Sequence, residues 1–331
     1  MLRPRHAAVA VAVSALLALL SSAAGGGDTI VLRLATTAPE GSPWADACQQ
    51  LTSGIEKASK GQVRMKLFRS GLLGEELETA QQLQAGTLDL YAGSSSSLVE
   101  ALPELGVLEM PFLFADLAEV DRALVRVLPS LGKAVAQRGF RIVGSTDVGF
   151  RHVGSKTPVQ SLTDLRRLRL RSQPAPLHAR LWTLLGVKHH PLGLPSVARA
   201  LEDGTIDAFD GSVGWMLAAG WVPMIKHLTL TSHMYQAGVI VAGPAALSKV
   251  PKALAQKLFA YDRDLSKDSY ARVRTLEQTL LAQMGGMGVT LATLPPAVRA
   301  GLARAAMPVR TEWRQSATPQ VRALLDSIEQ R

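Results

Sequence analysis

Apolar and polar positions alternate between short strand-like runs and longer helical stretches in the first third of the chain. Ile30–Ala35 is rich in apolar and β-branched residues, and Val63–Phe68 alternates with the period of two that strands show. Apolar side chains recur at helical spacing from Ser42 to Ser59. A helix over Glu75–Ala85, with acids in its first turn, then leads to a strand over Leu88–Ala92. This alternation predicts an α/β fold in which helices pack on a mixed or parallel sheet.

The same pattern returns in the second half of the chain, which predicts two α/β lobes of comparable size. Its short elements are strands over 141–144, 149–153, 168–172 and 206–209 and helices over 177–185 and 195–201. A periodic stretch of more than 30 residues, Lys252–Met284, exceeds the usual length of a globular helix, and we expect one helix that spans both lobes. Two final helices are predicted over Pro295–Trp313 and Pro319–Ile328.

Residues 1–24 have the features of a secretory signal peptide. Arg3 and Arg5 supply a positive start, Ala7–Leu20 is a run of small and apolar residues, and Ser22-Ala23-Ala24 offers small residues for cleavage. The apolar run of 14 residues is shorter than the roughly 20 residues of a membrane span. We therefore expect a cleaved signal peptide and an exported mature protein.

Composition narrows the function classes further. The 331 residues are 47% hydrophobic, which excludes a disordered chain, and the single cysteine, Cys48, excludes an intramolecular disulfide and paired-cysteine metal sites. The formal net charge of +9 favours an anionic partner. Nucleic acid is a poor candidate, because the arginines are dispersed and only 5% of residues are aromatic, with no stacking cluster.

Two arginines are the strongest candidates for binding an anion. The strand that contains Arg171 must end before Pro174, so Arg171 lies near its carboxyl end, where open α/β sheets bind ligands. A guanidinium there can hold a carboxylate through two hydrogen bonds. Arg151 closes the strand that begins at Gly149, just after the expected crossing between lobes. The alternative is that both arginines are ordinary solvated surface residues.

Other polar clusters give weaker signals. Ser94–Ser97 follow a predicted strand and offer four hydroxyls to a small ligand, or form a simple turn. His189 and His190 lack a third ligand at suitable spacing, so we expect no metal site and no cofactor. Asp207 and Asp210 are three apart on a strand and face opposite sides, which disfavours a carboxylate pair for hydrolysis. No nucleophile or phosphate-loop motif is present, and we expect a protein that is not an enzyme.

Several segments taken together resemble one family, the DctP-like solute-binding proteins of TRAP transporters. Their order and spacing match over essentially the whole mature chain. These segments are Leu32–Ala35, Gly71–Glu75, Leu83–Asp89, Met110–Phe114, Gly149–Arg151, Asp164–Arg171 and Ala200–Asp207.

The resemblance implies a two-lobed periplasmic-binding-protein fold, type II-like, with a long helix spanning both lobes and a ligand cleft between them. Lobe I would comprise residues 28–148 and 237–276, and lobe II residues 149–236 and 277–331. The family captures organic acids in the periplasm and passes them to the small and large membrane subunits of a permease driven by a sodium gradient. We expect this protein to act in the same way, as a monomer rather than a dimer.

The resemblance also implies site residues. Arg171 stands where the family's arginine grips the ligand carboxylate, and Arg151 where a second arginine often assists. A family asparagine falls on Gly211, an aromatic of the sialic-acid binders falls on Leu194, and charged contacts of those binders fall on Ser94 and Ser97. Phe209, Trp215 and Trp44 are the expected apolar walls.

These departures predict a cavity that keeps its arginine clamp and loses most other charge, which favours a keto, aromatic or fatty acid over a sialic acid. Three alternatives stay open. The ligand could be largely apolar or lipid-like, the protein could be a sensor that docks on a signalling receptor, or it could be a secreted hydrolase that uses Asp207 or Asp210.

Overall fold

The computed structural model describes residues 29–330, so the predicted signal peptide over residues 1–24 lies outside the described residues. The strands are β1 (Ile30–Thr36), β2 (Val63–Phe68), β3 (Leu90–Ser94), β4 (Arg141–Ser155), β5 (Arg169–Ser172), β6 (Lys188–Pro191), β7 (Ala208–Ser212), β8 (His227–Ala242) and β9 (Thr290–Thr293). The helices are α2 (Pro43–Ala58), α3 (Glu76–Ala85), α4 (Leu117–Gln137), α5 (Leu162–Arg167), α6 (Pro176–Leu184), α7 (Leu194–Glu202), α8 (Val213–Ala218), α9 (Pro244–Lys249), α10 (Lys252–Leu258), α11 (Arg263–Gln283), α12 (Pro296–Ser316) and α13 (Pro319–Glu329). Short 3₁₀ turns include η1 (Ser95–Leu98) and η2 (Pro103–Glu109).

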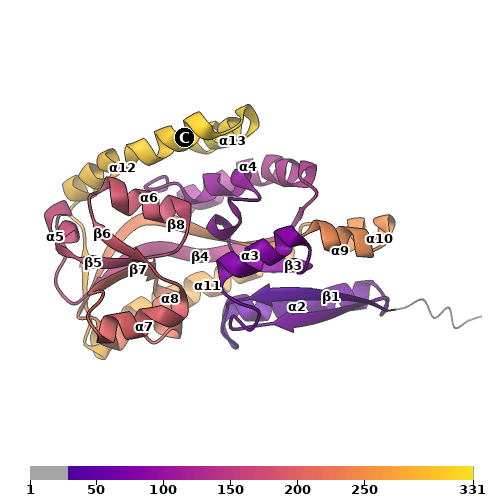
Figure 1. Ribbon diagram of the computed structural model, residues 1–331, viewed down its shortest axis with the longest axis horizontal. Helices are drawn as coiled ribbons and strands as arrows, with labels where there is room; N and C mark the ends of the chain where they lie inside the picture. Colours follow the sequence, from indigo (N-terminus) through magenta and orange to yellow (C-terminus); the bar gives the residue numbers. More distant parts are fainter. Residues whose placement is uncertain (1–28, 331) are drawn as a thin grey trace, which may run out of the picture.

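A single mixed sheet runs through the molecule in the order β2-β1-β3-β8-β4-β7-β5-β6, with β9 beside β8. The long antiparallel strands β4 and β8 connect its two ends. The end of β8, residues 238–242, pairs with β3, and the end of β4, residues 151–155, pairs with β7. Figure 1 shows β1, α2 and α3 gathered at one end and β5–β7, α7 and α8 at the other. The fold is therefore two-lobed, as predicted.

The strand β4 carries irregularities of the kind that bend a strand along the stretch that passes from one lobe to the other. Its pairing with β8 shifts register between Ile142 and Gly144, between Asp147 and Gly149, and between Arg151 and Val153. Gly149 has a φ of 108°, which a residue with a Cβ rarely adopts. The pattern predicts two separate strands here, because each irregularity interrupts the period-two alternation that marks a continuous strand.

The sequence pattern gives no strand for β8, although β8 is central to the sheet. Every residue of β8 from His233 to Ala242 is buried, so this part has no polar face and no alternation to detect. The helix α4 is also absent from the predicted elements. It carries Pro129 in its interior, which interrupts the usual signature of a helix.

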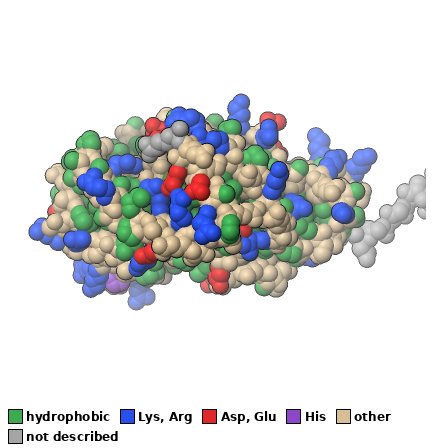
Figure 2. Space-filling view, turned by 90° about the horizontal axis from the view of Figure 1, so that it is seen from above, with side chains coloured by type: hydrophobic (Ala, Val, Ile, Leu, Met, Phe, Trp, Pro, Cys, Tyr) green, Lys and Arg blue, Asp and Glu red, His purple; other side chains and the backbone are tan. Residues whose placement is uncertain are grey.

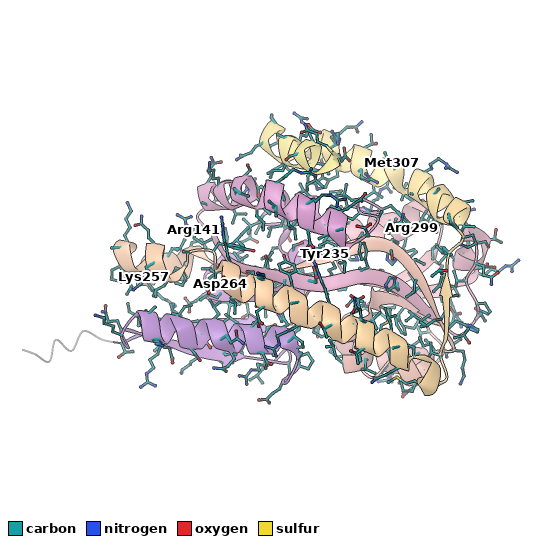
Figure 3. All side chains as sticks on the ribbon, turned by 180° about the vertical axis from the view of Figure 1, so that it is seen from behind. Arg141, Tyr235, Lys257, Asp264, Arg299 and Met307 are labelled. Carbon is teal, nitrogen blue, oxygen red and sulfur yellow. The ribbon has the colours of Figure 1, made fainter. Side chains whose placement is uncertain are left out.

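The predicted helix over Lys252–Met284 is wrong as one element. It divides into α10 and α11, because Phe259 is buried in the core of the first lobe and Asp262 starts a new helix by accepting a hydrogen bond from Leu265 N at 2.9 Å. The expectation that it spans both lobes is correct for α11, which contacts α2 in the first lobe and α8 in the second. Figure 3 shows α11 crossing the back of the sheet, with Asp264 near its start.

Three buried clusters form the core. One lies beneath α2 in the first lobe, one lies around α7 and α8 in the second, and the largest lies under α4, α6, α12 and α13. The C-terminal helices connect the lobes, because α12 packs on α6 while α13 packs on α4 and η2. The segment from residue 277 onward is therefore not confined to the second lobe, which differs from the predicted boundary.

Glu277 links α11 to the bend in β4 and gives a prediction about pH. A Cβ built on Gly149 would lie 3.3 Å from the Glu277 carboxylate, so the two elements are in close contact. Burial, assisted by the negative charge of Asp147, raises the pKa of Glu277 from 4.5 to about 7. The folded state therefore retains a proton between pH 4.5 and 7 that the unfolded state releases, and stability falls as pH rises through this window.

We expect Glu277→Gln to remove this loss, which amounts to up to about 3 kcal/mol of unfolding free energy. Urea unfolding at pH 5 and pH 8 would measure it, with the exposed Glu202→Gln as the control for a lost charge. The wild type and the control should lose more stability than Glu277→Gln between the two pH values. Parallel losses in all three proteins would show that Glu277 is not the responsible group.

Candidate ligand-binding site

A narrow cavity that contains both candidate arginines lies between the two lobes. It holds about 60 Å³ of space open to water, enough for about four water molecules, so it accepts only a small ligand unless the lobes move apart. The first lobe supplies part of the wall from α3 and η1, and the second lobe supplies most of the rest. The lining residues are Glu75, Glu76, Leu77, Ser97, Val148, Arg151, Arg171, Gln173, Pro174, Leu194, Gly211, Trp215, Trp221 and Gln236.

The cavity brings together six of the residues that sequence reasoning selected: Arg171, Arg151, Ser97, Leu194, Gly211 and Trp215. Ser94 lies directly behind the wall. Its hydroxyl is 3.0 Å from that of Ser97 and accepts a hydrogen bond from Gln173 Nε2 at 3.1 Å. Ser94 therefore contacts the lining residues without lining the cavity itself.

Phe209 and Trp44 do not line the cavity, which corrects the expectation that they form its apolar walls. Phe209 is fully buried in the core of the second lobe, with its ring 5.1 Å from that of Trp221. Trp44 donates from Nε1 to Thr36 Oγ1 at 3.0 Å and covers Gly238, where an added Cβ would come within 2.7 Å of the indole. Both aromatic side chains stabilise a lobe interior.

All five N–H groups of Arg151 are used by protein acceptors. Nε and Nη2 donate to the two carboxylate oxygens of Asp210 at 3.2 and 2.8 Å, and Nη2 also donates to the Asp210 carbonyl at 2.9 Å. Nη1 donates to Gln173 Oε1 at 2.9 Å and to Gln236 Oε1 at 2.7 Å. In this arrangement Arg151 holds the two glutamine side chains at the cavity and has no donor left for a ligand.

Asp210 supplies the charge that balances Arg151 inside the protein. Burial alone would raise the pKa of this carboxyl, but Arg151 and the neighbouring rings of His178 and His233, whose nitrogens lie 3.9 and 3.5 Å from Asp210 Oδ2, outweigh burial and hold the pKa well below its usual value. Trp182 Nε1 donates to the same carboxylate at 3.3 Å. Burial also lowers the pKa of His233, which favours a neutral ring. The Arg151–Asp210 pair is therefore a neutral unit.

Arg171, by contrast, keeps unused donors toward the cavity. Its Nε donates to the Leu192 carbonyl at 2.8 Å and its Nη1 to the Asp210 carbonyl at 3.4 Å. Among residues 29–330 these carbonyls are its only hydrogen-bond partners, so three of its five N–H groups remain. The guanidinium carbon lies 5.4 Å from the ring centre of Trp221, which fixes its plane. Burial lowers the pKa of Arg171 to about 10, so it stays charged at neutral pH.

The wall also contains two glutamates that sequence reasoning did not assign to the site. Acids in the first turn of a helix complement the helix dipole. Because this explanation accounts for Glu75 and Glu76, no pattern in the sequence indicated that they lie at a cavity. Their presence, with Gln173 and Gln236, contradicts the expectation that the cavity has lost most of its charge apart from the arginine clamp. Trp221 and Gln236 were missed because the sequence predicts no element around them.

The two carboxylates of the hydrolase alternative do not lie together. Asp207 pairs with Arg169 at 3.1 Å toward the surface, whereas Asp210 is buried against Arg151.

Across the described range, 29–330, no helix is long and apolar enough to cross a membrane. Figure 2 shows Lys and Arg side chains distributed over one face and mixed with hydrophobic and acidic ones.

Comparison with known proteins gives consistent matches. The family model for bacterial extracellular solute-binding protein, family 7 (DctP), matches residues 34–316. A solute-binding protein of Verminephrobacter eiseniae is 28% identical over 265 residues, covering 78% of each chain. The 2,3-diketo-L-gulonate-binding periplasmic protein of Escherichia coli is 24% identical and covers 75% of this chain and 76% of its own.

Solved structures agree with these matches. A TRAP periplasmic solute-binding protein from Bordetella bronchispeptica, with density assigned to pantoate, is 26% identical with a TM-score of 0.77 and covers 91% of this chain and 99% of its own. A TRAP periplasmic solute-binding protein from Citrobacter koseri with bound D-glucuronate has the same fold, with 23% identity, a TM-score of 0.82 and coverage of 91% and 99%. Because the family match extends over most of the sequence, the chain belongs to the DctP family of bacterial extracellular solute-binding proteins, family 7.

Proposed function

We propose that this protein is the periplasmic solute-binding subunit of a TRAP transporter and that it captures a small organic acid through Arg171. The observation that carries the proposal is a buried, charged guanidinium with three unused N–H groups at the wall of an interlobe cavity. A carboxylate is the partner that matches such a group in charge and shape. The D-glucuronate, diketogulonate and pantoate of the related proteins are all organic acids.

Binding follows from the geometry of Arg171. The Leu192 carbonyl and the Trp221 ring hold the guanidinium in place before the ligand arrives, so little side-chain entropy is lost on binding. The entering carboxylate accepts hydrogen bonds from the unused Nη donors. Closure of the lobes then excludes water, and the lower dielectric strengthens these charged hydrogen bonds.

We place the hinge where β4, β8 and α11 pass between the lobes, near residues 148–149, 236–237 and 276–277. Three observations support this assignment. Gly149 pairs directly with Gln236 across β4 and β8, Glu277 lies against Gly149, and β4 shifts register between Asp147 and Gly149. Small changes in the backbone dihedral angles of these residues can therefore turn one lobe relative to the other.

The protein then delivers its ligand to the small and large membrane subunits of the transporter and performs no chemistry on it. The separation of Asp207 from Asp210 supports a binding rather than a hydrolytic role. We further propose that it acts as a monomer in the periplasm after removal of residues 1–24. Service to a signalling receptor is the alternative that the same cavity would equally suit.

A thermal-shift panel on the dialysed mature protein tests this function. The panel contains pantoate, D-glucuronate, pyruvate and succinate as carboxylates, glucose as a neutral sugar, and decanoate as a lipid-like acid. At a hundred times its Kd, a ligand stabilises the fold by about 2.7 kcal/mol, which gives a clear rise in Tm. We expect a rise with at least one of the small acids. A response to glucose or decanoate alone would contradict the proposal.

A further inference from the structure

Glu75 faces the same cavity as Arg171 but comes from the opposite lobe. Arg171 lies on β5 of the second lobe, whereas Glu75 caps the start of α3 in the first. Both line the cavity wall. Burial raises the pKa of the Glu75 carboxyl above its usual value, and the Leu194 N–H and the charge of Arg171 oppose this by favouring the carboxylate. Glu75 in turn favours the charged form of Arg171. The cavity therefore presents a donor group on one side and an acceptor group on the other.

The neighbouring Glu76 cannot take this acceptor role, because its carboxylate is already saturated. It accepts hydrogen bonds from Ser94 N at 3.1 Å, Ser97 Oγ at 3.1 Å and Thr37 Oγ1 at 3.4 Å, and a further one from the Ser94 hydroxyl. Four donors fill the lone-pair sites of a carboxylate. Glu76 organises the η1 turn behind the cavity.

Glu75 retains acceptor capacity and is held across the cleft. Its Oε2 accepts a hydrogen bond from Leu194 N at 3.2 Å, at the N-terminus of α7, where a negative charge is favoured. Gly193 adjoins this contact, since a Cβ built there would lie 3.6 Å from Glu75 Cδ, at van der Waals distance. With the capping-box contact to the Glu78 backbone counted as well, lone-pair sites of the Glu75 carboxylate remain for another donor.

We propose that Glu75 is a specificity-determining residue, which selects monocarboxylates that carry a hydroxyl group and rejects dicarboxylates. This inference rests on the proposed function, in which Arg171 binds the ligand carboxylate. A hydroxyl can donate to Glu75, whereas a second carboxylate cannot donate and is repelled by it. The Arg151–Asp210 pair is internally neutral, so the lining offers no second free cation among the described residues to receive another negative charge.

Three acids with the same branched carbon skeleton test the inference. Pantoate has one carboxylate and two hydroxyls, tert-butylacetate has one carboxylate and no hydroxyl, and gem-dimethylsuccinate has two carboxylates. Calorimetry on the wild-type protein should show pantoate binding at least about tenfold more tightly than either of the others. The reason is that the free energy of a hydrogen bond to a charged group corresponds to at least about this change in Kd.

Glu75→Gln keeps the shape of the side chain and removes its charge. We expect this variant to bind pantoate about tenfold more weakly and gem-dimethylsuccinate more tightly than the wild type, so that the preference shrinks or reverses. Glu202→Gln, at the exposed far end of α7, loses the same charge and should keep the wild-type preference. The ratio of two affinities within one variant does not depend on how much of the sample is folded.

The outcomes separate the two proposals. The role of Glu75 is overturned if Glu75→Gln leaves the ratio of the affinities for pantoate and gem-dimethylsuccinate unchanged. It is also overturned if the wild-type protein binds tert-butylacetate or gem-dimethylsuccinate with the same affinity as pantoate. Arg171 can still bind carboxylates in both cases. Failure of all three acids to bind the wild-type protein overturns the inference for this skeleton. If the small acids of the thermal-shift panel also fail, the proposed function fails with it.

Discussion

Replacement of Arg171 by alanine should weaken binding of the ligand acid by about 2–5 kcal/mol, roughly thirtyfold to several thousandfold in Kd. The reason is that Arg171 is the buried cation of the cavity whose N–H donors are not already used by the protein. Without it, the ligand carboxylate would lose its hydration and gain no charged partner. Isothermal titration calorimetry with the tightest acid of the panel measures the change directly.

Two further variants make this result specific. Arg171→Lys keeps the charge but loses the fork of donors, so its binding should fall between those of alanine and the wild type. Arg169→Ala removes an arginine two residues away on the same strand, which pairs with Asp207 near the surface and does not line the cavity. This control should bind as the wild type does. Wild-type affinity in Arg171→Ala would remove Arg171 from the site.

Breaking the Arg151–Asp210 pair should have the largest effect on stability. Asp210→Asn leaves a fully buried guanidinium without its counter-charge, and loss of one partner of a buried pair costs about 3–5 kcal/mol. The hydrogen bonds from Arg151 to Gln173 and Gln236 also depend on this pair, so the cavity wall should loosen. Urea unfolding of the ligand-free protein measures the loss.

The double variant Arg151→Met with Asp210→Leu distinguishes charge from packing. Apolar residues of similar volume can replace a buried ion pair at little cost, so the double variant should be more stable than Asp210→Asn alone. If Asp210→Asn had the stability of the wild type, the Arg151–Asp210 pair would not be as desolvated as its burial indicates. A double variant that is less stable than the single one would show that shape matters more than charge here.

Sequence patterns predicted the arginines of the site better than its walls. Arg171 could be placed because Pro174 ends its strand and so fixes the arginine at the ligand-binding edge of a sheet. Phe209 could not be placed, because every residue of β7 is buried and such a strand shows no alternation to tell the face toward the cavity from the face toward the core. The same property concealed β8, and with it Gln236.

Long-range contacts explain the other differences. The role of Glu75 depends on α7, which follows more than 100 residues later in the chain and brings Leu194 N to its carboxylate. The break between α10 and α11 is also held from a distance, since Asp262 N donates to the Val143 carbonyl of β4 at 2.7 Å. Local periodicity carries no information about either contact. The two-lobed fold itself was predictable, because strand–helix alternation and a family resemblance agree on it.

The most direct test of carboxylate capture is a crystal structure of the mature protein with its tightest-binding acid. We predict the ligand in the interlobe cavity, with its carboxylate oxygens at hydrogen-bond distance, about 2.7–2.9 Å, from Arg171 Nη1 and Nη2. Arg151 should remain paired with Asp210 in that structure. A ligand bound elsewhere, or one in the cavity whose carboxylate makes no contact with Arg171, would contradict the proposed mode of binding.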